Sequence, residues 1–143
     1  MKTVFASWQF WALLAAVFAA LTAVFAKIGV SDIGTGLATL VRTLVVVALL
    51  TVILTLTGGW QGISGLSGRP VLFLVLSGVA TGASWLCYFH ALKLGDAARV
   101  APIDKLSVVL VALFGVWILG ERLSTINWLG VVLITGGALL VAV

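Results

Sequence analysis

The chain has 143 residues, of which 63% are hydrophobic and only 8% are charged. A water-soluble domain carries about 25% charged residues, so this composition excludes a soluble globule and indicates that the lipid bilayer is the solvent. The formal net charge of +4 comes from eight basic and four acidic residues, and the basic residues are spread singly along the chain. Because they form no patch, we expect no nucleic-acid partner. We predict a single all-α membrane domain over residues 1–143.

Five continuous apolar segments follow one another, separated by short stretches rich in glycine and polar residues. A helix needs about 20 mostly apolar residues to cross the hydrocarbon core. Barrel strands are excluded, because they alternate apolar and polar residues over about ten positions. Five transmembrane helices are therefore predicted, at Trp8–Lys27, Gly34–Thr57, Pro70–Leu94, Ala97–Leu119 and Ile126–Val143.

The first segment has some features of a secretory signal peptide, with Lys2 before an apolar run. Trp8 and Trp11, however, stand at its entrance as interfacial anchors of the kind that flank transmembrane helices. We therefore expect a retained first helix.

The third predicted helix carries a polar stripe. At 100° per residue its four members fall on one face, and Trp85 is expected to line a cavity with them. Such a stripe serves either hydrogen bonds between helices or contact with a substrate, and both readings remain open. The polar stripe consists of Ser77, Thr81, Ser84 and Tyr88.

The fourth predicted helix contains Asp104 beside Lys105, in the stretch RVAPIDKLSVV. Adjacent helical residues point about 100° apart, so we do not expect these two to pair with each other. Arg42, about eight residues into the second helix, is the predicted partner of Asp104. Ionisable residues at such depth cost about 2.5–3.5 kcal/mol each and usually face the bundle interior or a wet cavity. We therefore predict that Arg42, Asp104 and Lys105 line a cavity.

The depth of these charges depends on where the fourth helix begins. A start with Asp96 as N-cap places Asp104 well inside the helix. A start near Ala101 places Pro102 in the first turn, where its missing N–H costs nothing. Asp104 would then be interfacial and favoured by the helix dipole.

The fifth predicted helix contains Gly130 and Gly137, seven residues apart and on one face. Small residues in this arrangement let a second helix approach closely. We therefore expect this face to pair with another helix.

An odd number of helices places the two termini on opposite sides of the membrane. Basic residues in loops and termini set orientation when they favour one side. Here three fall on the N-terminal side and three on the other, which predicts copies inserted both ways up. The six are Lys2, Arg69 and Arg122, and then Lys27, Lys93 and Arg99.

The sequence has no motif of enzyme chemistry, such as G-x-S-x-G, H-E-x-x-H or a P-loop. One histidine and one cysteine do not build a zinc site of their own kind. We therefore expect no enzyme activity, no metal and no cofactor.

Two stretches resemble a known family. LGERLSTINWLGVVLITGGALLVAV, Leu119 to Val143, is similar to the closing segment of EamA-like members of the drug/metabolite transporter superfamily. YFHALKLGDAARVAPIDKLSVV, Tyr88 to Val109, resembles the half-length, five-helix bacterial and archaeal members. The resemblance implies a secondary transporter that is half of a ten-helix inverted-repeat fold. A free half must then pair with an antiparallel copy, with substrate held near the midplane between the halves.

The small multidrug resistance proteins are more distant relatives by resemblance, and their last helix pairs through glycines seven apart. They depend on a first-helix glutamate, whose position here is Ala19. With Arg42 and Lys105 present, we expect an anionic or zwitterionic substrate rather than a cation.

We therefore expect an inner (plasma) membrane exporter of a small metabolite, working as an antiparallel homodimer. Two alternatives remain open: a non-transporting subunit that packs against a larger membrane partner, and a flippase of a lipid-linked group.

Overall fold

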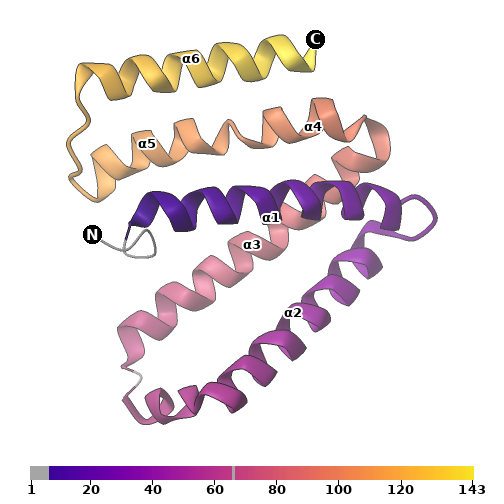
Figure 1. The fold of residues 1–143 in the computed structure, drawn as a ribbon, viewed down its shortest axis with the longest axis vertical. Helices are drawn as coiled ribbons and strands as arrows, with labels where there is room; N and C mark the ends of the chain where they lie inside the picture. The colour runs from indigo at the N-terminus through magenta and orange to yellow at the C-terminus, as the bar shows by residue number, and fades with distance from the viewer. Residues whose placement is uncertain (1–6, 66) are drawn as a thin grey trace. The chain divides into compact units, whose positions relative to one another are not determined.

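The computed structural model describes residues 7–65 and 67–143, and this part of the chain is helical and contains no strand (Figure 1). The all-α prediction is confirmed. The helices in chain order are α1 (Trp8–Gly29), α2 (Thr35–Thr57), the 3₁₀ helix η2 (Gly59–Gly65), α3 (Gly68–Leu94), α4 (Ala97–Asp104), α5 (Ser107–Ile118) and α6 (Thr125–Ala142).

These helices make five candidate membrane spans, as the apolar segments predict. The fourth span, Ala97–Ile118, is made of α4 and α5 together. Helix α3 begins at Gly68, two residues before the predicted start, and α6 begins at Thr125, one residue earlier than predicted. The predicted spans are therefore confirmed with shifts of one or two residues at the ends.

The start of α6 is determined by a capping box. The backbone N–H of Asn127 donates to Ser124 Oγ at 3.3 Å, and the Ser124 N–H donates to Asn127 Oδ1 at 3.1 Å. Two donors that the helix geometry leaves without partners are thereby satisfied. This explains why the helix begins directly after Ser124.

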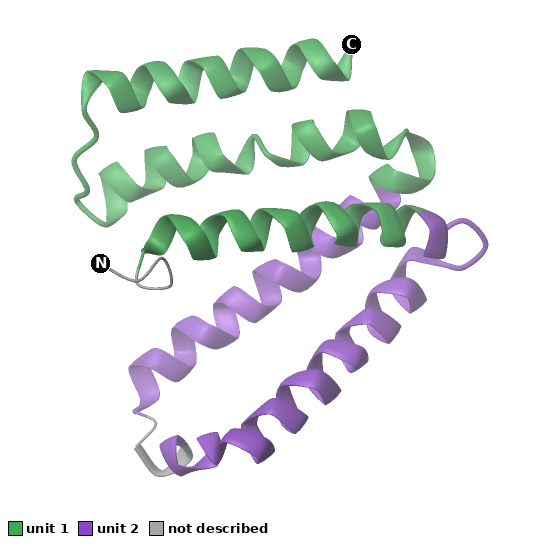
Figure 2. Ribbon diagram, in the orientation of Figure 1, with its two compact units in different colours: residues 1–27, 91–143 green, residues 28–90 purple. Residues whose placement is uncertain are grey.

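The chain divides into two compact units, coloured separately in Figure 2. Unit 1 comprises residues 1–27 and 91–143, and unit 2 comprises residues 28–90. In unit 2, α2 and α3 run in opposite directions and are joined through η2. In unit 1, α6 returns antiparallel to α4 and α5 and packs mainly on α4. The Arg99 guanidinium in α4 donates to the backbone carbonyl of Val143, just after α6.

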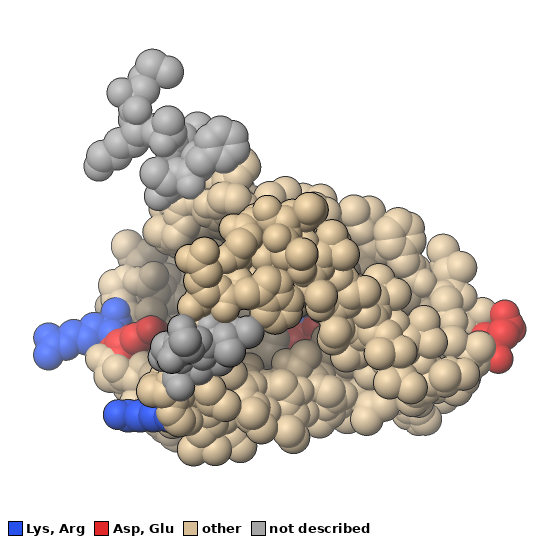
Figure 3. Space-filling model, turned by 90° about the horizontal axis from the view of Figure 1, so that it is seen from below, with Lys and Arg blue, Asp and Glu red and all other residues tan. Residues whose placement is uncertain are grey.

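Few side chains are buried within the described chain. The buried apolar residues are Ala23, Val30, Ala38, Phe89, Leu92 and Ala138. Most large apolar side chains of the spans are exposed instead, and most of the face drawn in Figure 3 is tan, with a few blue and red groups. An exposed leucine loses nothing in lipid, because acyl chains are as apolar as the side chain itself. This surface fits a bilayer.

The end of α3 is held by a lysine from α1. Lys27 Nζ donates to the backbone carbonyls of Leu92 at 2.6 Å and Gly95 at 2.8 Å, all within unit 1. The last carbonyls of a helix lack intrahelical partners, and the helix dipole favours a cation there. From the sequence we expected Lys27 only as a loop charge. Its contacts show that the end of α1 and the end of α3 lie together.

We expect Lys27→Met to destabilise the protein, because it removes both donors from the end of α3. Hydrogen bonds to charged groups contribute about 1.5–3 kcal/mol each, so the loss of both is expected to cost roughly 3–6 kcal/mol. The measurement is the helical circular dichroism signal of purified protein during heating in detergent. Lys93→Met, at an exposed lysine in the last turn of α3, is the matched control. Equal falls in melting temperature for the two variants would contradict the role assigned to Lys27.

Candidate functional site

Arg42 lies over the ring of Trp85. Its guanidinium carbon is 3.1 Å from the centroid of the indole, a contact that joins α2 to α3 within unit 2. Arg42 follows the first residue of α2 by seven positions, which places it about 11 Å along the helix axis at 1.5 Å per residue. A desolvated cation–π contact contributes up to about 2 kcal/mol. It therefore offsets a large part of the roughly 2.5–3.5 kcal/mol that an arginine costs inside a membrane.

Trp85 is itself held by two aromatic neighbours on α3. Its ring meets Tyr88 edge-on at a centroid distance of 5.5 Å and Phe89 at 5.4 Å. Phe89 is only 2% exposed. The indole is therefore fixed from its edges while its face receives Arg42. Phe89 was missed by the sequence reasoning, although its position four residues after Trp85 places both on the same helix face.

One member of the polar stripe on α3, Thr81, does not donate its hydroxyl to a neighbouring helix, one of the two roles predicted for the stripe. The Thr81 hydroxyl donates to the Ser77 carbonyl at 2.8 Å, within its own helix. Helix α2 repeats this pattern, with the Thr39 hydroxyl donating to the Thr35 carbonyl at 2.8 Å. Such bonds satisfy a hydroxyl donor locally. The Thr81 donor therefore serves its own helix rather than a neighbouring one, and substrate contact by the stripe stays a prediction.

Asp104 pairs with Lys105, which the sequence reasoning excluded. Lys105 Nζ lies 3.1 Å from Asp104 Oδ2, and the two side chains are 56% and 34% exposed, respectively. The prediction was wrong because it considered only the directions in which adjacent side chains leave the helix. The lysine stem has four flexible carbons, which let the ammonium swing back to its neighbour.

The fourth span is interrupted beside this pair. Leu106 N–H donates to the Ile103 carbonyl at 3.0 Å and Val108 N–H to the Lys105 carbonyl at 3.0 Å, the three-residue spacing of a 3₁₀ turn. The ψ angles of −9° at Lys105 and −15° at Leu106 agree with this tightening. The span is thus two helices with a tight turn between them.

The fourth span starts with the first residue of α4. The helix begins at Ala97 with Asp96 in the N-cap position, so Pro102 lies inside the helix and not in its first turn. A proline there removes the backbone hydrogen bond to the residue four positions earlier. Asp104 follows Ala97 by seven residues, about 11 Å along the axis. Of the two starts predicted, the structure has the deeper one.

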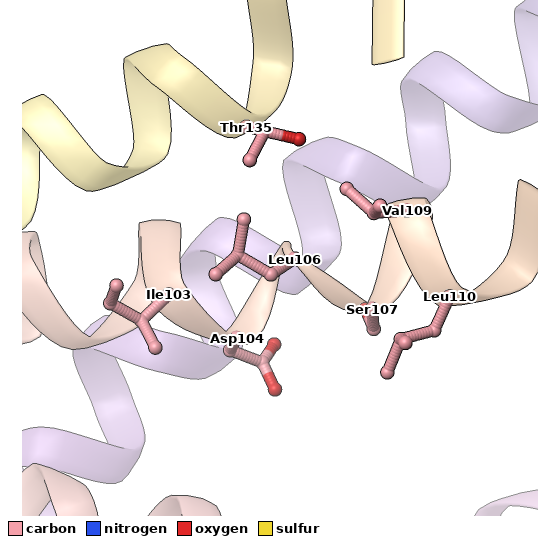
Figure 4. Close-up of a pocket in the computed structure, with 7 residues that line it drawn as sticks. All are labelled: Ile103, Asp104, Leu106, Ser107, Val109, Leu110 and Thr135. Atoms are coloured by element: carbon pink, nitrogen blue, oxygen red, sulfur yellow. The ribbon is translucent and has the colours of Figure 1, made fainter. Parts of the chain in front are cut away.

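A groove of about 430 Å³ lies at the interrupted turn of unit 1 and is lined by residues of α4, α5, the turn between them, and α6. In Figure 4, Asp104 and Ser107 point to one side of the chain while Leu106 points toward Thr135. The groove is mainly apolar, with these few polar groups at its wall. It is lined by Ile103, Asp104, Leu106, Ser107, Val109, Leu110 and Thr135.

The predicted pairing of Arg42 with Asp104 joins residues of different units. Within its own unit, each has another contact: Arg42 with Trp85 and Asp104 with Lys105. The pairing between the units stays a prediction.

The glycine face of α6 is open within the chain. A methyl group built at Gly130 or Gly137 meets no atom within 4 Å. The face of α6 that packs on its neighbours carries the buried Ala138 and the half-buried Thr135 instead. Within the described residues of unit 1, the two glycines are therefore not used for close helix packing.

Comparison with known proteins agrees with this architecture. The model of the EamA-like transporter family matches residues 6–143. A protein of Sinorhizobium sp named "Uncharacterized transporter in cobO 3'region" is 65% identical over 137 residues, which are 96% of this chain and 97% of that protein. No solved structure matches the chain. With a family match over nearly every residue and five apolar spans, the chain is a multi-pass membrane protein that belongs to the EamA-like transporter family.

Proposed function

We propose that this protein is a secondary transporter that exports a small metabolite across the inner (plasma) membrane and works as an antiparallel homodimer. The observation that carries the proposal is the family match over residues 6–143 on a chain with five membrane spans. The Sinorhizobium relative, itself named a transporter, is matched over 97% of its length. The relative is therefore named a transporter although its length is close to that of this chain, which has five spans.

The dimer is supported by the small share of residues in each span that are buried within the chain. In the most apolar window of each span, at most 11% of residues are buried. A substrate pathway needs polar groups enclosed away from lipid, because exposed polar groups inside a bilayer are costly. A second copy supplies additional walls for such a pathway.

The antiparallel arrangement is supported by charge and by the odd number of spans. Three basic residues in loops, at the terminus or at the ends of helices fall on each side, so the positive-inside rule selects neither orientation. Two copies inserted in opposite directions reproduce the inverted pair of halves on which many transporters are built.

The proposed pathway runs along the contacts described above. Arg42 on Trp85 provides a cation within the α2–α3 unit, and Asp104 with Lys105 provides an ion pair beside the interrupted fourth span. The polar stripe on α3 adds hydroxyl oxygens that accept hydrogen bonds. The proposal gives each of these groups, within its own unit, a role in the substrate path.

Opposite insertion of copies predicts that a reporter fused to the C-terminus will be found on both sides of the membrane. The measurement compares a reporter that is active only outside the cytoplasm with one that fluoresces only inside it, and both should give signal. Adding two lysines beside Arg122 should shift the population toward one orientation, because the charge count would no longer be equal. A reporter detected on one side only in the unaltered chain would rule out dual topology.

We expect Gly137→Leu to weaken the dimer by roughly tenfold, because a bulky side chain separates helices that meet at the glycine face. Cross-linking of the protein in membranes measures the dimer fraction. Gly136→Leu is the matched control, since Gly136 is also open within the chain but points about 100° away. Equal loss of dimer in both variants would contradict pairing through Gly130 and Gly137.

Transport itself is tested with purified protein in liposomes. Vesicles preloaded with one unlabelled metabolite at a time should accumulate its labelled form by counterflow, and a pH gradient should show whether protons drive the flux. We expect saturable accumulation for at least one metabolite. Accumulation no higher than in empty liposomes, together with a stoichiometric foreign membrane protein in cross-links, would favour the subunit alternative.

A further inference from the structure

Arg42 carries a positive charge inside a span, and unit 2 provides it with an aromatic ring rather than an anion. The one acidic residue of residues 28–90 is Asp32, whose carboxylate accepts a hydrogen bond from the neighbouring Ser31 at 2.9 Å. Within the described residues of unit 2, no carboxylate is within ion-pair distance of Arg42, and no acceptor receives a hydrogen bond from it. Its N–H groups therefore need an acceptor that unit 2 does not supply.

Two other basic side chains of the described spans, Lys27 and Lys105, are used differently. Lys27 donates to two backbone carbonyls at the end of α3, and Lys105 pairs with Asp104. Both contacts satisfy a cation with oxygen atoms of the chain itself. Arg42 contrasts with them, because its contact with Trp85 stabilises the charge but uses none of its hydrogen-bond donors.

The stacked geometry selects the kind of acceptor that fits. A guanidinium is planar, and its five N–H donors point outward in that plane. Arg42 places its guanidinium carbon over the indole ring, and this contact uses none of its N–H donors. A carboxylate offers two coplanar oxygens that match two parallel donors of a guanidinium.

The ring beneath Arg42 is fixed before any ligand arrives. Tyr88 and Phe89 meet Trp85 edge-on, and Phe89 is buried. A ligand that binds Arg42 therefore does not have to order the indole. Sites prepared in this way bind more tightly, because less conformational freedom is lost on binding.

We propose that Arg42 and Trp85 form a site that binds the carboxylate group of the transported molecule. This inference rests on the proposed function, and it names the substrate class as organic carboxylates, including zwitterions. The N–H groups of Arg42 donate hydrogen bonds to the carboxylate, and the Trp85 ring holds the guanidinium in place.

Calorimetric titration of the purified protein in detergent tests binding without transport. The probes are acetate, succinate and benzoate, each compared with its uncharged amide, and inorganic phosphate. We expect at least one carboxylate to bind while its amide does not. Binding should also change tryptophan emission, because the anion alters the field at the stacked indole, and Trp85→Phe should remove that change.

Conservative variants locate the site. Arg42→Lys keeps the charge but loses the planar pair of donors, so carboxylate affinity should fall by about tenfold or more. Arg69→Lys makes the same change at an exposed arginine at the start of α3 and should leave the affinity unchanged. Helical circular dichroism confirms that both variants are folded before titration.

Three results would overturn the inference. One is carboxylate affinity that is equal in the unaltered protein and Arg42→Lys, or that is undetectable for every carboxylate probe. Another is tighter binding of phosphate than of any carboxylate. The third is carboxylate binding that appears only after Asp104→Asn, because the anion that answers Arg42 would then be Asp104.

The outcome is separable from that of the proposed function. Carboxylate binding that Arg42→Lys weakens supports this site even if liposomes show no flux, which would count against transport alone. Flux of a metabolite that lacks a carboxylate, without carboxylate binding, overturns the site and leaves the transporter proposal standing.

Discussion

The absence of water in the hydrocarbon core is the constraint on which this structure depends. A polar group placed there has no solvent to bond with, so its partner must come from the chain, and for the backbone only helices or closed barrels provide one. This explains the continuous helices of the five spans. It also explains why threonine hydroxyls in α2 and α3 donate to carbonyls of their own helix. At helix ends, Lys27 supplies the donors for α3, and Ser124 with Asn127 supplies a cap for α6.

The same constraint governs the charged side chains, and it has two different solutions here. Asp104 and Lys105 neutralise each other across one peptide unit. Arg42 instead lies over the ring of Trp85, a contact that lowers the cost of the charge and uses none of the hydrogen-bond donors of the guanidinium. The first solution makes a local neutral pair, and the second leaves the guanidinium without a paired carboxylate among the described residues of its own unit. This difference is why Arg42 is the more informative residue for function.

The fourth span is not a continuous α-helix, because a 3₁₀ turn separates α4 from α5. Pro102 lies inside α4, and the chain tightens to a 3₁₀ turn at Lys105 and Leu106 before α5 begins. Mid-helix 3₁₀ stretches often mark functional hinges or strained sequence. A mainly apolar groove beside this turn is lined by the polar residues Asp104, Ser107 and Thr135 among others. Arg42 thus lies where α2 meets α3 in unit 2, and Asp104 lies where α4 meets α5 in unit 1.

The sequence by itself determined the membrane class, the five spans and the position of Arg42 along its helix, because hydropathy and the 1.5 Å helical rise depend only on local composition and spacing. It also singled out Asp104, Lys105, Trp85 and Tyr88 as residues of interest, since polar and aromatic side chains stand out in an apolar run. Only the tertiary structure decided their partners. Arg42 on Trp85 and Lys27 on the end of α3 join segments 43 and 65 or more residues apart, and no local pattern records which helix faces meet. The Asp104–Lys105 pair needed the structure for another reason: it depends on the rotamer of a flexible side chain, which helix geometry leaves undetermined.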